Sequence, residues 1–161
     1  MTIIDPTSGV ARFSVVPAAY VLFLRAGETG DEVLLQLRQN TGFMDGHWAS
    51  AAAGHIERGE TATDAARREA AEELGVISLD LRFATSMQRT AHGHDIDERV
   101  DFFFVARSWS PEPRILEPAK CADLRWCPIA DLDRLAEPVV PHERYVLGLL
   151  PDVPALTSFG F

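Results

Sequence analysis

Three glutamates lie close together at positions 69, 72 and 73 of the chain. On an α-helix successive residues turn by about 100°, which places Glu69, Glu72 and Glu73 within one arc of about 100°. Like charges at this spacing repel one another and destabilise an isolated helix. A hard divalent cation would remove the repulsion, because Mg²⁺ binds carboxylate oxygens while keeping waters and substrate phosphates as further ligands. The spacing is therefore compatible with a magnesium site, although a solvated acidic helix face is the more common reason for such a cluster.

A loop with two glycines precedes these glutamates. Gly54 and Gly59 can adopt backbone conformations that other residues avoid, so the loop could direct a backbone carbonyl towards the same cation. Glu60 stands just before the expected helix, where the helix dipole favours a negative charge. Arg68 can pair with Glu72 one helical turn later. The loop and the helix together form one candidate site.

The helix that must carry the glutamates is expected over residues 61–74. Thr61 followed by Asp64 is typical of a helix start, and Gly75 is typical of a helix end. Ala66, Ala70 and Leu74 recur every four residues and form an apolar stripe of mainly small side chains. Such a stripe lets the helix pack closely on a sheet while its acidic edge faces a cleft.

The rest of the chain alternates apolar runs with turns. Strands are expected over residues 13–25, 33–38, 48–53, 79–89, 100–107 and 124–127, and further helices over 129–135 and 143–150. The first two strands are expected to pair as a hairpin. The strand-rich order without repeated βαβ units predicts an α+β fold, a sandwich with a mixed sheet in its centre.

Composition narrows the class of protein. The chain has 161 residues and a net charge of −9, which predicts a single domain over 1–161 with a loose leader over 1–12 and a tail over 151–161. The negative charge argues against binding to duplex nucleic acid or an anionic membrane. No apolar run is long enough to span a bilayer, and the N-terminus lacks the features of a signal peptide, so a cytoplasmic location is expected. Cys121 and Cys127 lack the spacing of a zinc or redox motif, and we expect them to be buried thiols.

The segment 54–76 resembles the signature of the Nudix (MutT-like) hydrolases. That pattern is Gly, five residues, Glu, seven residues, then Arg-Glu-apolar-any-Glu-Glu-any-Gly-apolar. The positions that match it here are Gly54, Glu60, Arg68, Glu69, Ala70, Glu72, Glu73, Gly75 and Val76. Ala70 departs slightly, since a larger aliphatic residue is more usual there. The resemblance implies the Nudix fold, an α/β/α sandwich, over roughly residues 13–150, and hydrolysis of a nucleoside diphosphate linked to another group.

The resemblance also implies roles for individual residues. Glu69, Glu72 and Glu73 would be metal ligands for Mg²⁺, for which Mn²⁺ could substitute, and one of them could activate water. The backbone carbonyl of Ala53 would be a further ligand, and Arg68 would orient the carboxylates. Gly54, Glu60 and Gly75 would shape the loop and the helix end. Family members often take one more carboxylate from a later loop; Glu117 is the candidate here, ahead of Asp97 and Glu98.

The substrate is less defined by the sequence. Subgroup marks for ADP-ribose, diadenosine polyphosphates, NADH and coenzyme A are missing, which leaves (deoxy)nucleoside triphosphates as the favoured class. Arg38, Phe43, Trp48 and Phe102 are candidate substrate contacts, although core packing is the more common role for such aromatic residues. Arg38, Arg89 and Arg99 could contact phosphate, with solvated surface positions as the alternative. A homodimer is compatible with the sequence.

Two other functions remain open. The segment Ser50-Ala51-Ala52-Ala53-Gly54-His55 replaces the usual Leu-Pro-Gly-Gly approach and resembles a variant in isoprenoid diphosphate isomerase-like relatives. That chemistry in its best-known form uses a cysteine before the signature, whereas both cysteines here follow it. A ligand-binding regulator with weak or no catalysis is the other alternative, and such members usually lose signature glutamates that this chain keeps.

Overall fold

A long central strand, β3 (Val16–Gly27), organises the computed structural model, which describes residues 2–161. Its apolar run from Ala18 to Leu24 is buried along its whole length. Continuous apolar runs are typical of strands that are covered on both faces. β3 pairs in parallel with β8 (Arg99–Ser110), and antiparallel with β6 (Ala52–His55) and, at its far end, with β4 (Gly30–Arg38). The strand therefore lies in the interior of the sheet.

The sheet is mixed, as the sequence predicts. Its remaining strands are β5 (Trp48–Ser50), β7 (Ser78–Arg89), β9 (Cys121–Pro128) and β10 (Leu156–Phe159). The main order is β10-β7-β8-β3-β4-β5, with β6 beside β3 and β9 beside β4. β10 pairs with β7 in parallel, as β3 does with β8, and the other pairs are antiparallel. Within residues 2–161, no helix has the length and apolar character that crossing a bilayer requires.

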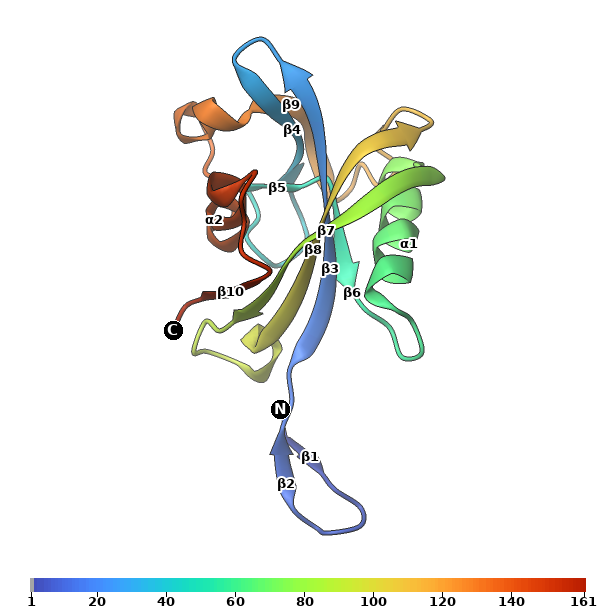
Figure 1. Cartoon of the computed structure of the whole chain (residues 1–161), viewed down its shortest axis with the longest axis vertical. Helices are drawn as coiled ribbons and strands as arrows, with labels where there is room; N and C mark the ends of the chain where they lie inside the picture. Colours follow the sequence, from blue (N-terminus) through green and yellow to red (C-terminus); the bar gives the residue numbers. More distant parts are fainter. Residues whose placement is uncertain (1) are drawn as a thin grey trace.

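Two α-helices flank this sheet on opposite sides (Figure 1). Helix α1 (Ala62–Leu74) covers one face and helix α2 (Pro141–Leu149) covers the other. Each helix closes its own apolar cluster: Val21 and Phe23 belong to the cluster with α1, and Leu22 and Leu24 to the cluster with α2. The alternating side chains of β3 thus feed two cores, which confirms the α/β/α sandwich.

Helix α1 forms much as its sequence predicts. The hydroxyl oxygen of Thr61 accepts a hydrogen bond from the backbone N–H of Asp64 at 3.1 Å, which satisfies one of the free donors at the helix start. Ala66, Ala70 and Leu74 are buried against the sheet. Gly75 ends the helix with φ 70°, a left-handed conformation that favours glycine.

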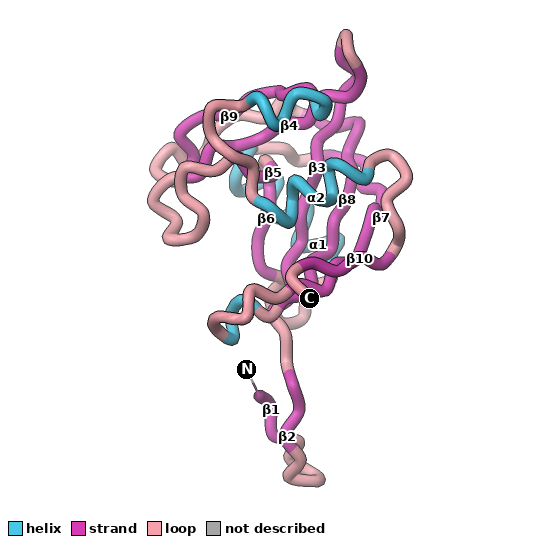
Figure 2. Tube along the Cα trace, turned by 90° about the vertical axis from the view of Figure 1, so that its left-hand side faces the viewer, coloured by secondary structure: helices cyan, strands magenta, loops and turns pink. Residues whose placement is uncertain are grey.

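The N-terminal segment differs from the loose leader expected over residues 1–12. Residues 2–13 form a hairpin of β1 (Thr2–Ile4) and β2 (Ala11–Phe13), which projects from the body of the molecule (Figures 1 and 2). The Asp5 carboxylate accepts the N–H groups of Thr7 and Ser8 at 2.8 and 3.2 Å and thereby holds the turn. Position 1 lies outside the described residues.

Three other segments also differ from the expectation. Residues 48–53 split into β5 and β6 at Ala51, because β5 pairs with β4 and β6 pairs with β3. Residues 129–134 adopt a 3-10 helix rather than an α-helix. The C-terminal segment contributes β10, which adds an edge strand to the sheet. Cys121 and Cys127 are free and buried on β9.

Candidate functional site

Four glutamates from two parts of the chain line one cavity of about 440 Å³. Glu69, Glu72 and Glu73 come from α1, Glu117 comes from the loop between β8 and β9, and Ala53, Gly54 and His55 come from β6. We call this space the acidic cavity. The structure therefore brings together the favoured ligand candidates, whereas the weaker contenders Asp97 and Glu98 are not among the described residues that line this cavity.

Glu73 is a partly buried residue in the wall of the acidic cavity. Its Oε2 accepts the backbone N–H of Ala53 at 3.2 Å. Burial, and next the charge of Glu69, raise the pKa of Glu73 to about 8. Burial also raises the pKa of Glu69, against the opposing effect of Arg68. Crowded carboxylates in a shielded position are a poor arrangement unless positive charge is nearby.

Arg68 supplies positive charge at the edge of this cluster. Its guanidinium donates to Glu60 at 2.8 Å, to Glu69 at 2.6 Å and to the backbone carbonyl of His55 at 3.0 Å. Glu72 is 3.4 Å away, with a side chain that is 59% exposed. These bonds raise the pKa of Arg68, with Glu60 as the main cause. Arg68 and Glu60 therefore connect the helix to the loop before it.

Gly54 makes room for Glu69. A Cβ atom on Gly54 would overlap the Glu69 carboxylate. The requirement at this position is the absence of a side chain rather than an unusual backbone conformation. Gly54 therefore lets the helix edge approach β6 closely enough for the carboxylates to share one cavity.

The loop that carries Glu117 is attached to the end of α1. The N–H groups of Arg114 and Leu116 donate to the carbonyls of Leu74 and Glu73, both at 3.1 Å. These bonds satisfy carbonyls that the end of a helix leaves free. The charge of Glu117 contributes to the raised pKa of both Glu69 and Glu73, so the four carboxylates interact.

The carboxylates do not converge on one point. Across the part of the chain that the structure describes, no three His, Cys, Asp or Glu side chains form a group that could hold a metal ion as they stand. The ion pairs explain this, because Glu69 and Glu72 turn towards Arg68 while Glu73 bonds to β6. Cys121 also lines the acidic cavity, and burial raises the pKa of its thiol.

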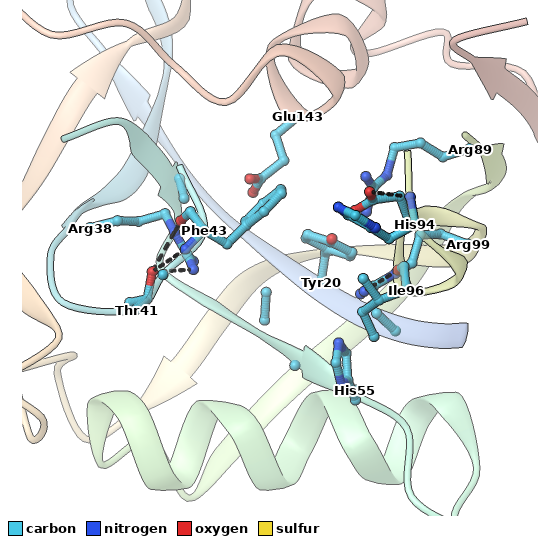
Figure 3. Close-up of a pocket in the computed structure, with 16 residues that line it drawn as sticks. Tyr20, Arg38, Thr41, Phe43, His55, Arg89, His94, Ile96, Arg99 and Glu143 are labelled. Carbon is cyan, nitrogen blue, oxygen red and sulfur yellow. Dashed lines mark hydrogen bonds between the residues drawn. The ribbon is translucent and has the colours of Figure 1, made fainter. Parts of the chain in front are cut away.

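A second cavity of about 530 Å³ adjoins the acidic one. Arg38, Thr41, Ala53, Gly54 and His55 line both. We call this space the adjoining cavity; it is drawn in Figure 3, with Arg38, Thr41 and Phe43 at one end and Arg89, Arg99 and His94 at the other. A ligand bound by the glutamates could therefore extend into it past Arg38 or His55.

A buried polar group forms the wall of the adjoining cavity. The ring of Tyr20 stacks on Phe103, with centroids 4.5 Å apart, and its hydroxyl lies 3.2 Å from His142 Nε2. Burial, and next the charge of Arg89, lower the pKa of His142 to about 2, so the imidazole is neutral. Arg89, which also lines the adjoining cavity, forms an ion pair of 2.8 Å with Asp101.

Glu143 is a second buried carboxyl group in this wall. It lies in the first turn of α2 and accepts hydrogen bonds from the Ser50 hydroxyl and, at 2.7 Å, from the Ser50 backbone N–H. Its side chain points towards the space beside Phe43 in Figure 3. Burial raises the pKa of Glu143 despite these bonds.

The aromatic candidates separate into two groups. Phe43 lines the adjoining cavity and is 40% exposed. Trp48 is fully buried, and its indole N–H donates to Glu137 at 3.0 Å. Phe102 packs in the cluster beneath α1. Among the described residues that line the two cavities, neither Trp48 nor Phe102 is included.

Some site residues have no clear signal in the sequence. Tyr20 lies inside an apolar run and reads as a core residue, and Glu143 reads as a surface position of a helix start. Arg89 and Arg99, which the sequence favours as surface residues, are largely buried. Asp97 lines the adjoining cavity, and Glu98 accepts a hydrogen bond from the Thr90 hydroxyl at 2.6 Å. The alternation of strand residues would identify these positions only once the strand register is known.

Comparison with known proteins places these features in context. Residues 15–150 match the family model of the NUDIX domain. An isopentenyl-diphosphate Delta-isomerase from Cereibacter sphaeroides is 33% identical over 122 residues, which cover 74% of this chain and 67% of that protein. A MutT NUDIX hydrolase from Burkholderia pseudomallei superposes with a TM-score of 0.67 at 25% identity, over 85% of this chain and 98% of that one. The NUDIX domain of Shewanella oneidensis NrtR complexed with ADP ribose has a TM-score of 0.69 at 18% identity, over 89% of each chain.

Proposed function

Because this chain belongs to the Nudix family, we propose that it is a magnesium-dependent hydrolase of a phosphoanhydride bond in a nucleoside diphosphate derivative. The observation that carries the proposal is the acidic cavity, where Glu69, Glu72, Glu73 and Glu117 lie together. (Deoxy)nucleoside triphosphates are the first substrates to test. The products would be a nucleoside monophosphate and either pyrophosphate or a phosphorylated remainder.

The donor set of the acidic cavity fits a hard divalent cation. Four carboxylates and the Ala53 carbonyl supply only oxygen ligands, which Mg²⁺ prefers. The raised pKa values of Glu69 and Glu73 indicate carboxylates that lack sufficient positive charge around them. A divalent cation supplies two things when bound: neutralisation of phosphate oxygens and a more acidic water.

The chain's own residues would bind and orient the substrate. Arg38 lines both cavities and can pair with phosphate oxygens at their junction. Its guanidinium is held by the Phe43 carbonyl at 2.8 Å and the Thr41 hydroxyl at 2.9 Å. Phe43 and Tyr20 offer aromatic surface in the adjoining cavity, where the remainder of the substrate would lie. Arg68 keeps Glu69 in position from outside the cavity.

Glu73→Gln tests the hydrolase. The change keeps the shape of the side chain and removes its charge, so we expect kcat with Mg²⁺ to fall by about a hundredfold or more. Folding should not suffer, because a neutral amide is easier to bury than a carboxylate. Product release from deoxynucleoside triphosphates, ADP-ribose and dinucleotides would be measured with Mg²⁺ and with Mn²⁺.

Glu112→Gln is the matched control, since Glu112 is exposed in the same loop as Glu117 and lines neither cavity. It should retain the wild-type rate, and Mn²⁺ binding followed by electron paramagnetic resonance should weaken only in Glu73→Gln. An unchanged rate in Glu73→Gln on a confirmed substrate would contradict the proposal. Tight nucleotide binding without turnover in the wild type would favour a regulator instead.

Two observations favour a second candidate, an isoprenoid diphosphate isomerase. The curated relative with that name is 33% identical, and Cys121, although it follows the signature in sequence, lines the acidic cavity. The fold returns β9 to this wall through its pairing with β4. The position of the cysteines along the chain is therefore a weaker objection to isomerase chemistry than the sequence alone indicates.

Cys121→Ser separates the two candidates. A hydrolase should keep its rate in this variant, because the thiol takes no part in the proposed reaction. Isopentenyl diphosphate incubated with Mg²⁺ would be followed by nuclear magnetic resonance for a double-bond isomer and by a phosphate assay. Isomer formation without phosphate release, lost in Cys121→Ser, would establish the isomerase and reject the hydrolase.

A further inference from the structure

We propose that the end of the adjoining cavity formed by Arg89 and Arg99 binds a second anionic group of the substrate, a phosphate or a carboxylate. The proposal rests on the proposed function, since it assumes a diphosphate at the acidic cavity. Among nucleoside diphosphate derivatives, it favours those that carry a further phosphate or carboxylate at the other end over simple nucleoside triphosphates. The group at Arg89 and Arg99 would be retained unchanged while the phosphoanhydride bond is cut elsewhere.

Two arginines occupy facing positions on neighbouring strands. Arg89 on β7 is the register partner of Arg99 on β8. Their side chains are only 7% and 11% exposed. Like charges directly opposite each other in a sheet are unfavourable, and burial makes the repulsion stronger. Something must offset the cost of burying two guanidiniums together. Both line the adjoining cavity, where an anionic ligand could do so (Figure 3).

One carboxylate serves both guanidiniums. Asp101 lies 2.8 Å from Arg89 Nε and 3.7 Å from Arg99 Nε, and among the ion pairs between residues 2–161 no other carboxylate is within 4.0 Å of either. The neighbouring Tyr20 and His142 do not compensate, because burial raises the pKa of the phenol and lowers that of the imidazole, so both are neutral. At least one positive charge therefore remains uncompensated.

Two other acidic side chains line the cavity. Glu143 accepts a hydrogen bond from Ser50, and the positive charge that stabilises its ionised form comes from Arg38. The carboxylate of Asp97 accepts the backbone N–H of His94 at 3.2 Å. Neither forms one of the ion pairs of Arg89 or Arg99. The surplus charge is therefore local to the Arg89–Arg99 end.

Hydrogen bonding at this end is also incomplete. Arg99 Nε and Asp101 Oδ1 are both buried, and neither has a hydrogen-bond partner within the described part of the chain. Their separation of 3.7 Å is too long for a hydrogen bond. Among residues 2–161, the hydrogen bond of the Arg99 side chain is a long one, 3.3 Å to the Ile96 carbonyl. Its guanidinium thus keeps donors for the planar, two-point pairing that arginine makes with phosphate or carboxylate.

The position of the pair sets the length of the substrate. His55 on β6 is the partner of Ala18 on β3, and Ala18 is the partner of Asp101 on β8, with β7 next. At about 4.8 Å between strands, Arg89 lies roughly 14 Å from the strand beside the glutamates. A sugar or nucleoside between the diphosphate and the second anion would fill this separation.

Matched substrate pairs test the inference. NADPH and NADH, coenzyme A and its 3′-dephospho form, and UDP-glucuronate and UDP-glucose each differ by one phosphate or carboxylate. We expect at least one pair to show a kcat/KM at least tenfold higher for the compound with the extra anion. That ratio should fall to about one in Arg99→Gln. Equal kcat/KM within every pair that is hydrolysed would overturn the inference.

Two further variants and a control distinguish anion binding from a structural role. Arg99→Lys keeps the charge without the planar donor pair, so the ratio should be intermediate. Asp101→Asn removes the competing carboxylate, so binding of the anionic compound should tighten, an effect that simple loss of packing would not give. Arg82→Gln, an arginine on the same strand as Arg89 with a side chain that is 81% exposed, should leave the ratio unchanged.

Binding of inorganic phosphate separates this inference from the proposed function. With EDTA present, phosphate should shift the Nε–H resonances of Arg89 and Arg99 in nuclear magnetic resonance spectra of the wild type and of Glu73→Gln. In Arg99→Gln, the remaining Arg89 resonance should not shift. If these shifts were seen but no substrate were hydrolysed, the anion site would stand and the proposed hydrolase activity would be rejected. Absence of the shifts would overturn the anion site. Phosphate binding without any difference in kcat/KM between the paired substrates would overturn the claim that the bound anion is part of the substrate.

Discussion

Individual side chains set the geometry of the acidic cavity through very close contacts. Arg68 links Glu60 and Glu69 and also holds the carbonyl of His55, so one guanidinium fixes helix and loop together. Gly54 permits the approach of Glu69 because it has no side chain. The residues of the signature thus include groups that shape the acidic cavity through contacts with one another and with the backbone.

Gly54→Ala should disturb the site more than the fold. Its Cβ would overlap the Glu69 carboxylate, which must then move away from β6. We expect kcat/KM to fall by about tenfold to a hundredfold, as is typical when residues that support metal ligands are changed. Steady-state kinetics and the Mg²⁺ concentration for half-maximal rate would be measured.

Gly148→Ala on α2 is the control for that substitution. The added Cβ there would meet Arg144 Nη1 at 3.0 Å, the movable end of a long side chain, and alanine favours a helix over glycine. The control should be as active as the wild type. Equal activity of Gly54→Ala and Gly148→Ala would show that the contact with Glu69 does not matter for catalysis.

At the level of single residues, prediction from the sequence reached the glutamates and their partner Arg68, but not the buried polar residues in the wall of the adjoining cavity. Glu69, Glu72 and Glu73 are recognisable from helical spacing, and Glu117 only from a family resemblance. Tyr20 lies in an apolar run and Glu143 lies at a polar helix start, and neither setting gives a local sign of a cavity. Arg89 and Arg99 look like surface residues until their strands are paired, because burial of a charged side chain depends on contacts that are distant in sequence.

At the level of secondary structure, the glutamates of α1 are positioned by the close packing of small residues between the helix and the sheet. Helix α1 lies against the sheet on Ala65, Ala66 and Ala70, each of which is fully buried. Such side chains let the helix axis approach the strands, which brings the carboxylate edge to β6. The distance between α1 and the sheet therefore controls the acidic cavity.

Ala70→Leu should test this packing. Three additional carbon atoms in a filled space should lower the free energy of unfolding by about 1–3 kcal/mol. Urea unfolding followed by circular dichroism would measure the change. Ala71→Leu, one position later on the exposed side of the same helix, should change stability by less than about 0.5 kcal/mol. A stable Ala70→Leu variant would mean that the helix can shift to admit a larger residue.

Elements with strong local patterns were predicted well, and those that depend on partners were not. Helix α1 begins after Thr61 and ends at Gly75 as expected, because both cap residues act locally. The separation of β5 from β6, the N-terminal hairpin and β10 depend on which strand lies beside them. No local signal in the sequence identifies the neighbouring strand. The sequence therefore predicts one strand in place of β5 and β6, a loose leader in place of the hairpin and a tail in place of β10.

Across the whole molecule, ionisable groups buried between the sheet and α2 connect stability to pH. His142 is neutral in the folded protein, with its pKa lowered from 6.5 to about 2 by burial and nearby arginines. The unfolded chain takes up this proton below about pH 6.5 and the folded protein does not. Stability from this group is therefore fully present above pH 6.5 and decreases as the pH falls.

The wild type should lose about 2 kcal/mol more unfolding free energy than His142→Gln between pH 7.5 and pH 5. Burial raises the pKa of Asp101 and of Glu143, so these groups act in the opposite direction, and comparison with the variant largely removes their contribution. Urea unfolding at each pH would give the difference. His94→Gln, at an exposed position, should follow the wild type; a parallel pH dependence in His142→Gln would contradict the assignment.

The central strand β3 has a mechanical consequence. It carries hydrogen bonds to β4, β6 and β8, so the wall beside the glutamates and the wall beside the buried arginines share one stiff support. Neither wall can swing away without breaking rows of backbone bonds. The span between the two ends of the cleft is therefore nearly constant, and the protein would select ligands by their length, with adjustment left to the side chains and the surrounding loops.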